Sequence, residues 1–151
     1  MKRNMSGISN RYIESILFPS CKYFRGVFSA NTIPLVLTNC ETFSLVCNLS
    51  KVEEEGSHFV SILASRSHVL YIDSLGLPCI VKEISSFLQK LDRPVFYNVT
   101  PIQAVTSKFC GFYCILFILH HERQNVQLKF GSKNLEENDN LCINYIHQLL
   151  K

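Results

Sequence analysis

The sequence has little charge, no tryptophan and no long apolar run. Charged residues make up 18% of the 151 residues, against 47% hydrophobic residues. This balance excludes an extended disordered chain and favours a single compact domain over residues 1–151. The longest apolar stretch, residues 109–119, is far shorter than the roughly 20 residues of a membrane-spanning helix. We therefore expect no membrane segment and a soluble, monomeric protein.

No secretory signal opens the sequence, because the first residues lack an apolar segment and a cleavage site behind their basic residues. The seven cysteines are an odd number. Together these features predict a protein that is not secreted and keeps its cysteines as free thiols in a reducing compartment. There is also no internal repeat and no low-complexity tract that would indicate a second domain.

The net charge of +3 is too small to require a nucleic-acid partner, but the basic excess is uneven. Five basic residues and one acidic residue, Glu14, occur among the first thirty; the basic ones are Lys2, Arg3, Arg11, Lys22 and Arg25. A solvated basic face and a weak, non-specific DNA-binding surface both fit this pattern.

Hydrophobic periodicity divides the chain into alternating helices and strands. It predicts helices over residues 6–17 (ended by Pro19), 80–91, 110–121 and 141–151, and strands over 42–50, 58–64, 69–73 and 95–99. Residues 21–34 have no clear period and read as a loop. The order of elements predicts an α+β fold with a mostly antiparallel central sheet, in which the apolar helix 110–121 is buried.

The predicted hairpin of residues 58–73 brings a histidine and an aspartate together. In an antiparallel pair the numbers of facing residues add to a constant, which is 131 if the turn centres on Ser65 and Arg66. His58 then lies opposite Asp73, and a register slip of one residue still leaves them neighbours. A carboxylate beside an imidazole fixes its tautomer and stabilises the imidazolium, as a catalytic base requires.

Cys110 lies at the predicted N-terminus of the buried helix. The free N–H groups and the positive dipole end there favour a thiolate, and an imidazolium would favour it further. Gly111 removes side-chain bulk beside the sulfur, so that a substrate carbonyl can approach. Gln103, in the preceding loop, can donate an amide N–H to a developing oxyanion. Nucleophile, base, orienting carboxylate and oxyanion donor are thus all present.

Each of these residues also has an ordinary structural explanation. Cys110 can be a core residue, His58 can be a satisfied core histidine, and Asp73 before Ser-Leu-Gly can belong to a turn. A zinc site could be drawn from Cys110 and Cys114 with the histidines at the end of the helix, but their spacing is not that of a zinc knuckle. We therefore expect no metal, and we expect Cys114 in the core beneath the site.

The order of these residues resembles the adenovirus-type cysteine proteases, the adenains, and more distantly the proteases that process ubiquitin-like proteins such as SUMO. The motifs are "GSHFVSI" with His58, "YIDSLG" with Asp73, "PIQ" with Gln103 and "FCGFYC" with Cys110. The upstream stretch "CKYFRGVFSANTIP" is also similar. The likeness covers about residues 8–125.

The resemblance implies a papain-like, adenain-like fold and a thiol protease that cleaves peptide bonds through an acyl-enzyme. It implies Cys110 as nucleophile, His58 as general base and acid, Asp73 as orienting carboxylate and Gln103 as part of the oxyanion hole. The residue after the catalytic histidine, usually tryptophan in adenains, is Phe59 here and implies an aromatic wall of the substrate channel. Cleavage after small residues such as glycine, in a viral protease that matures virion precursors, is the implied function.

The resemblance also bears on cofactors and location. The chemistry itself requires no cofactor, while adenains use DNA and a short basic peptide as activators. Residues 91–100, where adenains bind that peptide through a disulfide, contain no cysteine, so we expect no covalent attachment, although edge-strand addition stays open. The implied location is the host nucleus or cytoplasm and the virion. Two alternatives remain: an isopeptidase that removes ubiquitin-like modifiers, and a catalytically silent interaction protein.

Overall fold

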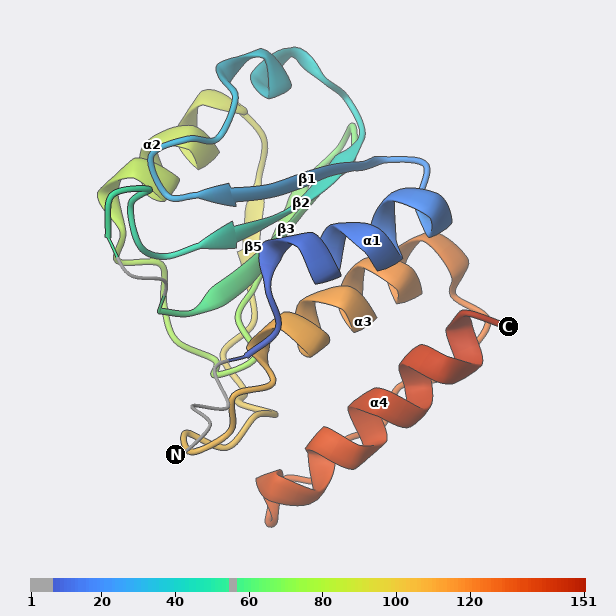
Figure 1. The fold of residues 1–151 in the computed structure, drawn as a ribbon. Coiled ribbons are helices and arrows are strands. Elements are labelled where there is room, and N and C mark those ends of the chain that lie inside the picture. The colour runs from blue at the N-terminus through green and yellow to red at the C-terminus, as the bar shows by residue number, and fades with distance from the viewer. Residues whose placement is uncertain (1–6, 55–56) are drawn as a thin grey trace.

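The computed structural model describes residues 7–54 and 57–151 and is built around a five-stranded sheet (Figure 1). The strands are β1 (Phe24–Ser29), β2 (Phe43–Asn48), β3 (Phe59–Ala64), β4 (Val69–Ile72) and β5 (Val95–Tyr97), and they lie side by side in sequence order. The helices are α1 (Asn10–Ser20), α2 (Lys82–Lys90), α3 (Cys110–Arg123) and α4 (Asn138–Leu149), with short 3-10 helices at Leu35–Asn39 and Leu135–Glu137.

The sheet is mixed, so the predicted antiparallel arrangement holds for its inner strands and not for its two edge strands. The inner pairs β2–β3 and β3–β4 are antiparallel, whereas the outer pairs β1–β2 and β4–β5 are parallel. A parallel neighbour requires the chain to cross over and return in the same direction. Helix α2 provides this crossover before β5, and the 3-10 helix at Leu35–Asn39 provides it before β2.

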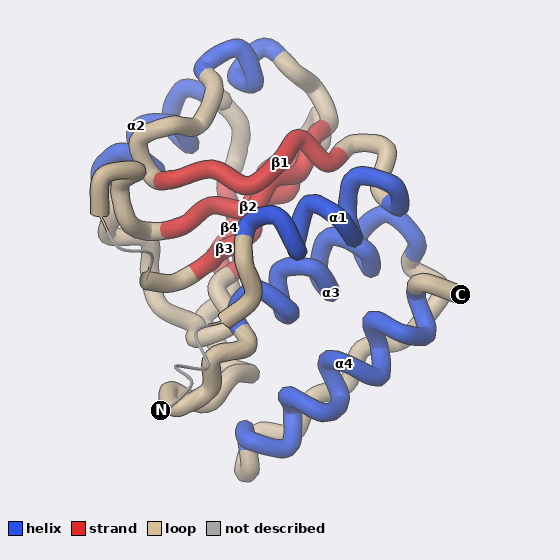
Figure 2. The backbone as a smooth tube through the Cα atoms, viewed as in Figure 1, coloured by secondary structure: helices blue, strands red, loops and turns tan. Residues whose placement is uncertain are grey.

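Helices cover both faces of the sheet and give the protein two apolar cores (Figure 2). One core joins α1, α3 and α4 to one face, with α3 between the sheet and α4. The other core places α2 against the opposite face. The sandwiched position of α3 explains why it is apolar on nearly every side. Among the described residues there is no helix with the length and apolarity needed to cross a membrane.

Two boundaries near the N-terminus differ from the prediction. The first helix begins at Asn10, where the Ser9 hydroxyl accepts a hydrogen bond from the Tyr12 N–H (3.1 Å), and the predicted start at Ser6 lies outside the described residues. It continues through Pro19, because the Cys21 N–H donates to the Leu17 carbonyl (2.8 Å) and closes the last turn.

The predicted loop 21–34 contains strand β1, and α2 is shorter than predicted. The regular alternation that marks a strand is interrupted in β1 by a bulge around Gly26, which has a φ of 131°. At α2 the apolar spacing starts at Ile80, but that side chain is exposed and the helix begins at Lys82. The strand predicted over residues 95–99 likewise ends at Tyr97.

The β3–β4 hairpin determines how His58 and Asp73 meet. The numbers of its paired residues add to 133, as in Ile62 opposite Tyr71. The predicted sum of 131, which places His58 directly opposite Asp73, is therefore wrong. Extended by one pair, the observed register puts Asp73 opposite Val60.

The turn between β3 and β4 explains this difference. The Ser65 N–H donates to the His68 carbonyl (2.9 Å), so Arg66 and Ser67 are the central residues of the turn. The predicted centre of the turn lies one residue earlier in the sequence. This difference shifts the cross-strand partner of every residue by two positions. Because two residues are one period of a strand, side chains keep their face of the sheet, and the two functional residues remain neighbours.

Candidate active site

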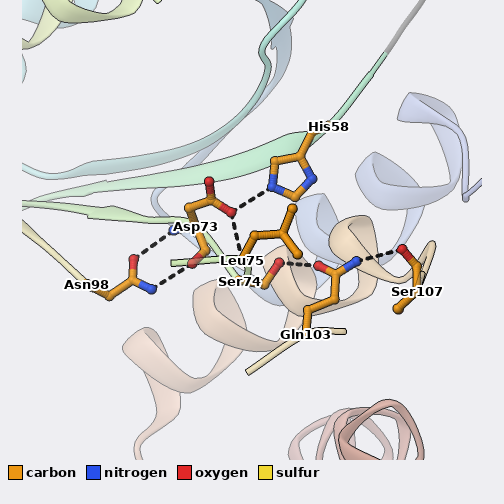
Figure 3. A network of polar contacts seen from close by, with 7 residues as sticks. All are labelled: His58, Asp73, Ser74, Leu75, Asn98, Gln103 and Ser107. Atoms are coloured by element: carbon orange, nitrogen blue, oxygen red, sulfur yellow. Dashed lines mark hydrogen bonds and ion pairs between the residues drawn. The ribbon is translucent and has the colours of Figure 1, made fainter. Parts of the chain in front are cut away.

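His58 and Asp73 meet where β3 begins and β4 ends (Figure 3). The His58 Nε2 lies 2.6 Å from the Asp73 Oδ1, and the Asp73 side chain is only 1% exposed. The His58 side chain is 13% exposed and therefore reaches the surface of the cleft. With Nε2 bound to the carboxylate, Nδ1 is the ring atom left for proton transfer.

Hydrogen bonds hold both the side chain and the backbone of Asp73. The Leu75 N–H donates to Oδ1 (2.8 Å), and Asn98 binds the Asp73 backbone twice. In that pair of bonds the Asp73 N–H donates to the Asn98 Oδ1 (2.8 Å), while the Asn98 Nδ2 donates to the Asp73 carbonyl (2.6 Å). Asn98 follows the neighbouring strand β5, so it ties the end of β4 to the next segment of the sheet.

Cys110 is the first residue of α3, and its thiol lies close enough to His58 for each group to shift the pKa of the other. Burial raises the pKa of the Cys110 thiol, but hydrogen bonds from His58 and from the backbone N–H groups of Phe59 and Gly111 outweigh burial and hold the pKa below its ordinary value. The unpaired N–H groups of the first helical turn add positive potential at the same place. The arrangement therefore favours a thiolate.

The pKa of His58 moves in the opposite direction. Burial alone lowers it, but hydrogen bonds to Asp73 and Cys110, together with attraction to their negative charges, raise it to about 9. An acid whose pKa falls beside a base whose pKa rises is the signature of a proton held on the base. Both shifts favour a thiolate–imidazolium pair of Cys110 and His58.

Gln103 is buried, with an exposed fraction of 2%, and its amide has a fixed orientation. Its Oε1 accepts a short hydrogen bond from the Ser74 hydroxyl, and its Nε2 donates to the Ser107 carbonyl (3.0 Å). Because a carbonyl can only accept, the nitrogen must face Ser107. One of the two N–H groups of this amide is thereby engaged, and the second remains for another acceptor in the cleft that Gln103 shares with Cys110.

These residues line one cleft of about 580 Å³. His58, Gln103 and Cys110 share its wall with Phe59 and Leu75, and the N-terminal segment at Gly7 and Ile8 forms another part of it. Phe59, the predicted aromatic wall residue, thus lines the same cleft as Cys110.

The structure places Gly111 differently from the prediction. Gly111 is buried and is not one of the described residues that line the cleft. A Cβ built on it would lie 2.7 Å from the Ile8 Cγ1 and 3.3 Å from the Ile13 Cδ1. The missing side chain therefore lets the N-terminal segment and α1 pack against α3, rather than making room for a substrate carbonyl.

In comparisons with known proteins, no family model matches this sequence, and no curated protein matches it either.

The other cysteines differ sharply from Cys110. All seven lie in the described part of the chain as free thiols. Cys114 is fully buried one turn further along α3, and burial raises its pKa well above the ordinary value, in agreement with its predicted place in the core. Burial likewise raises the pKa of Cys21 and of Cys47 to about 12. At Cys110, by contrast, the pKa of the thiol is lowered.

Several site residues have no signal in the sequence. Asn98, Ser74 and Ser107 hold the functional groups in place, and each is a common polar residue next to a strand or in a loop. Asn98 falls within the strand predicted over residues 95–99, and in the structure it directly follows β5, the neighbour of β4.

Proposed function

We propose that this chain is a cysteine endopeptidase with an adenain-like fold, which hydrolyses peptide bonds after small, glycine-type residues. The observation that carries the proposal is one cleft in which His58, bonded to the buried Asp73 carboxylate, faces the same space as Cys110 at a helix N-terminus. The opposite pKa shifts of the two reacting groups support it, since a structural cysteine in an apolar site has a raised pKa.

The proposed reaction begins with attack of the Cys110 thiolate on the carbonyl carbon of the scissile bond. The negative charge moves to the carbonyl oxygen, which accepts hydrogen bonds from the Gln103 amide and the Cys110 backbone N–H. The C–N bond then breaks as the His58 imidazolium gives its proton to the leaving amine. An acyl-enzyme thioester and a free amine result.

Water completes the proposed cycle. Neutral His58 takes a proton from a water molecule that attacks the thioester carbon, and the C–S bond breaks to release the carboxyl product. The released sulfur is a thiolate beside an imidazolium, as at the start. Asp73 keeps its charge throughout and stabilises the imidazolium at both steps.

The biological setting follows from the resemblance and belongs to the same proposal. The substrates would be virion structural precursors, in the host nucleus or cytoplasm and in the virion. A weak DNA interaction would use Arg11, Lys22 and Arg25, which are exposed, whereas Lys2 and Arg3 lie outside the described residues. Stimulation of peptide cleavage by DNA at low salt would support this part, and its absence would contradict it.

The first test is the reactivity of the thiols. At pH 6–7 iodoacetamide is expected to alkylate Cys110 at least about tenfold faster than the half-buried Cys40 and Cys79, because His58 and the start of α3 favour the thiolate of Cys110. Quenched samples, digested and read by mass spectrometry, give the rate at each site. Equal rates would contradict the proposal and favour a silent interaction protein.

The second test is hydrolysis. Glycine-containing peptides are expected to be cleaved by the wild type and by Cys40→Ala, and not by Cys110→Ala or His58→Ala. Circular dichroism would establish that the inactive variants are folded. Release of a ubiquitin-like modifier from a lysine conjugate, without cleavage of the peptides, would replace the endopeptidase by the isopeptidase alternative.

A further inference from the structure

The start of helix α4 is hydrogen-bonded to the loop that carries Gln103. The Asp139 Oδ2 accepts from the Ser107 hydroxyl (2.8 Å), and its Oδ1 accepts from the Tyr113 hydroxyl (2.9 Å). Neither bond is needed for the proton transfers proposed above. Asp139 therefore requires a separate explanation.

Ser107 connects this carboxylate to two parts of the site. Its hydroxyl, while donating to Asp139, accepts a hydrogen bond from the Phe109 N–H (3.1 Å), just before Cys110 opens α3. Its carbonyl accepts from the Gln103 Nε2 (3.0 Å). A single residue thus fixes the beginning of the nucleophile's helix and the direction of the oxyanion-binding amide.

Asn138 holds the other end of the same loop. Its side chain is 1% exposed, and its Nδ2 donates to the carbonyls of Ile102 and Gly131, each at 2.8 Å. The Gly131 N–H donates in return to the Asn138 Oδ1 (2.9 Å). Because Ile102 immediately precedes Gln103, two successive residues of α4 hold the loop on both sides of the functional amide.

We infer that Ser107 and Asp139 are positioning residues for acyl transfer, and that they aim the Gln103 amide at the developing oxyanion. This inference rests on the proposed peptidase function. Loss of the Ser107–Asp139 bond should let the loop move relative to α3. Displacements of about 1 Å at a catalytic group are sufficient to lower turnover strongly.

The test compares two substitutions that each remove one hydroxyl from the same carboxylate. Ser107→Ala removes the bond that leads to Gln103, whereas Tyr113→Phe removes a bond of similar length and leaves Ser107 in place. Peptide hydrolysis is measured as kcat and KM, and alkylation of Cys110 by iodoacetamide is measured on the same samples. Ser107→Thr, which retains a hydroxyl, serves as the rescue variant.

Ser107→Ala should lower kcat by about tenfold with little change in KM, because oxyanion contacts act in the transition state. Cys110 alkylation should stay within about threefold of wild type, since alkylation forms no oxyanion. Tyr113→Phe should keep kcat within about twofold, and Ser107→Thr should recover much of the loss. In a Gln103→Ala background, Ser107→Ala should have little further effect if it acts through Gln103.

Three results would overturn the inference. Equal kcat values for Ser107→Ala and Tyr113→Phe would mean that the carboxylate serves stability alone. Failure of both Ser107→Ala and Asp139→Asn to fold, while Tyr113→Phe folds, would likewise mean that the Asp139 carboxylate serves stability alone. A wild-type protein that hydrolyses no amide substrate would remove the proposed function and this inference together, and that result is distinct from the other two.

Discussion

At the scale of single residues, the charge on His58 depends on one buried carboxylate. Asp73 is almost fully enclosed, so its charge acts on the imidazole with little screening by water. Burial by itself would leave His58 neutral, and the thiolate at Cys110 depends in turn on a charged His58. The ionisation of His58 and that of Cys110 are therefore coupled.

This coupling predicts the pH dependence of peptide cleavage. Activity should fall above a pH of about 9, where His58 loses the proton that it gives to the leaving amine. It should also fall at low pH, where the Cys110 thiolate becomes protonated. Asp73→Asn keeps the shape of the side chain and removes its charge, so the pKa of His58 should fall and that of Cys110 should rise. The pH range of activity should therefore become narrower at both its acidic and its alkaline limit. A profile of kcat/KM against pH measures this change.

Glu83→Gln is the matched control for this substitution. It also converts a carboxylate to an amide, but Glu83 lies in α2 and pairs with Lys51 (3.4 Å), away from the cleft. Both limbs of its pH profile should coincide with those of the wild type. An unchanged profile for Asp73→Asn would show that the Asp73 charge does not act on the reacting pair.

At the scale of secondary-structure elements, the contact between Ile8 and Gly111 sets how close α3 lies to the segment before α1. Alanine normally stabilises a helix relative to glycine. At Gly111, however, a Cβ would lie only 2.7 Å from the Ile8 Cγ1, so the two segments would have to separate. Steric crowding should therefore outweigh helix propensity.

We predict that Gly111→Ala lowers the free energy of unfolding by about 1–2 kcal/mol, as overpacking of a buried site does. The double variant with Ile8→Ala should lose less free energy of unfolding than the sum of the two single losses, because the second substitution removes the crowding atoms. Urea denaturation of all four proteins measures this coupling. Strict additivity would contradict the proposed contact.

The elements also show which features of the fold can be predicted from the sequence. Period-two alternation identified β3 and β4 and placed His58 and Asp73 on a common face, although the turn centre was misplaced by one residue. Strand β1 was missed, because the bulge at Gly26 interrupts its alternation. Local patterns therefore identify elements better than they fix register.

The sequence likewise predicts some features of the candidate site and not others. The sequence motifs identified His58, Gln103 and Cys110, which line one cleft, and Asp73, which is hydrogen-bonded to His58. The hydrogen bond from Ser107 to Asp139 joins residues that are 32 positions apart. No periodicity encodes such a contact, because it depends on how α4 packs against α3.

At the scale of the whole molecule, the two apolar cores differ in their position relative to the cleft. The core under α2 supports the sheet from the face opposite to α3. The core of α1, α3 and α4 lies beneath Cys110 and also fixes the start of α4, from which Asn138 and Asp139 reach the Gln103 loop. Equal losses of stability in the two cores should therefore have unequal effects on catalysis.

Leu88→Ala and Ile146→Ala test this difference. Both side chains are buried, with exposed fractions of 2% and 4%, and each truncation should cost about 2–5 kcal/mol of stability. Under conditions where both variants remain folded, Leu88→Ala should retain the wild-type kcat within about twofold. Ile146→Ala loosens α4 and should lower kcat several-fold at nearly constant KM, through the same loop that Ser107 and Asp139 hold. Urea denaturation and steady-state kinetics on the same preparations measure both quantities, and equal kcat values would mean that α4 contributes to stability without positioning the site.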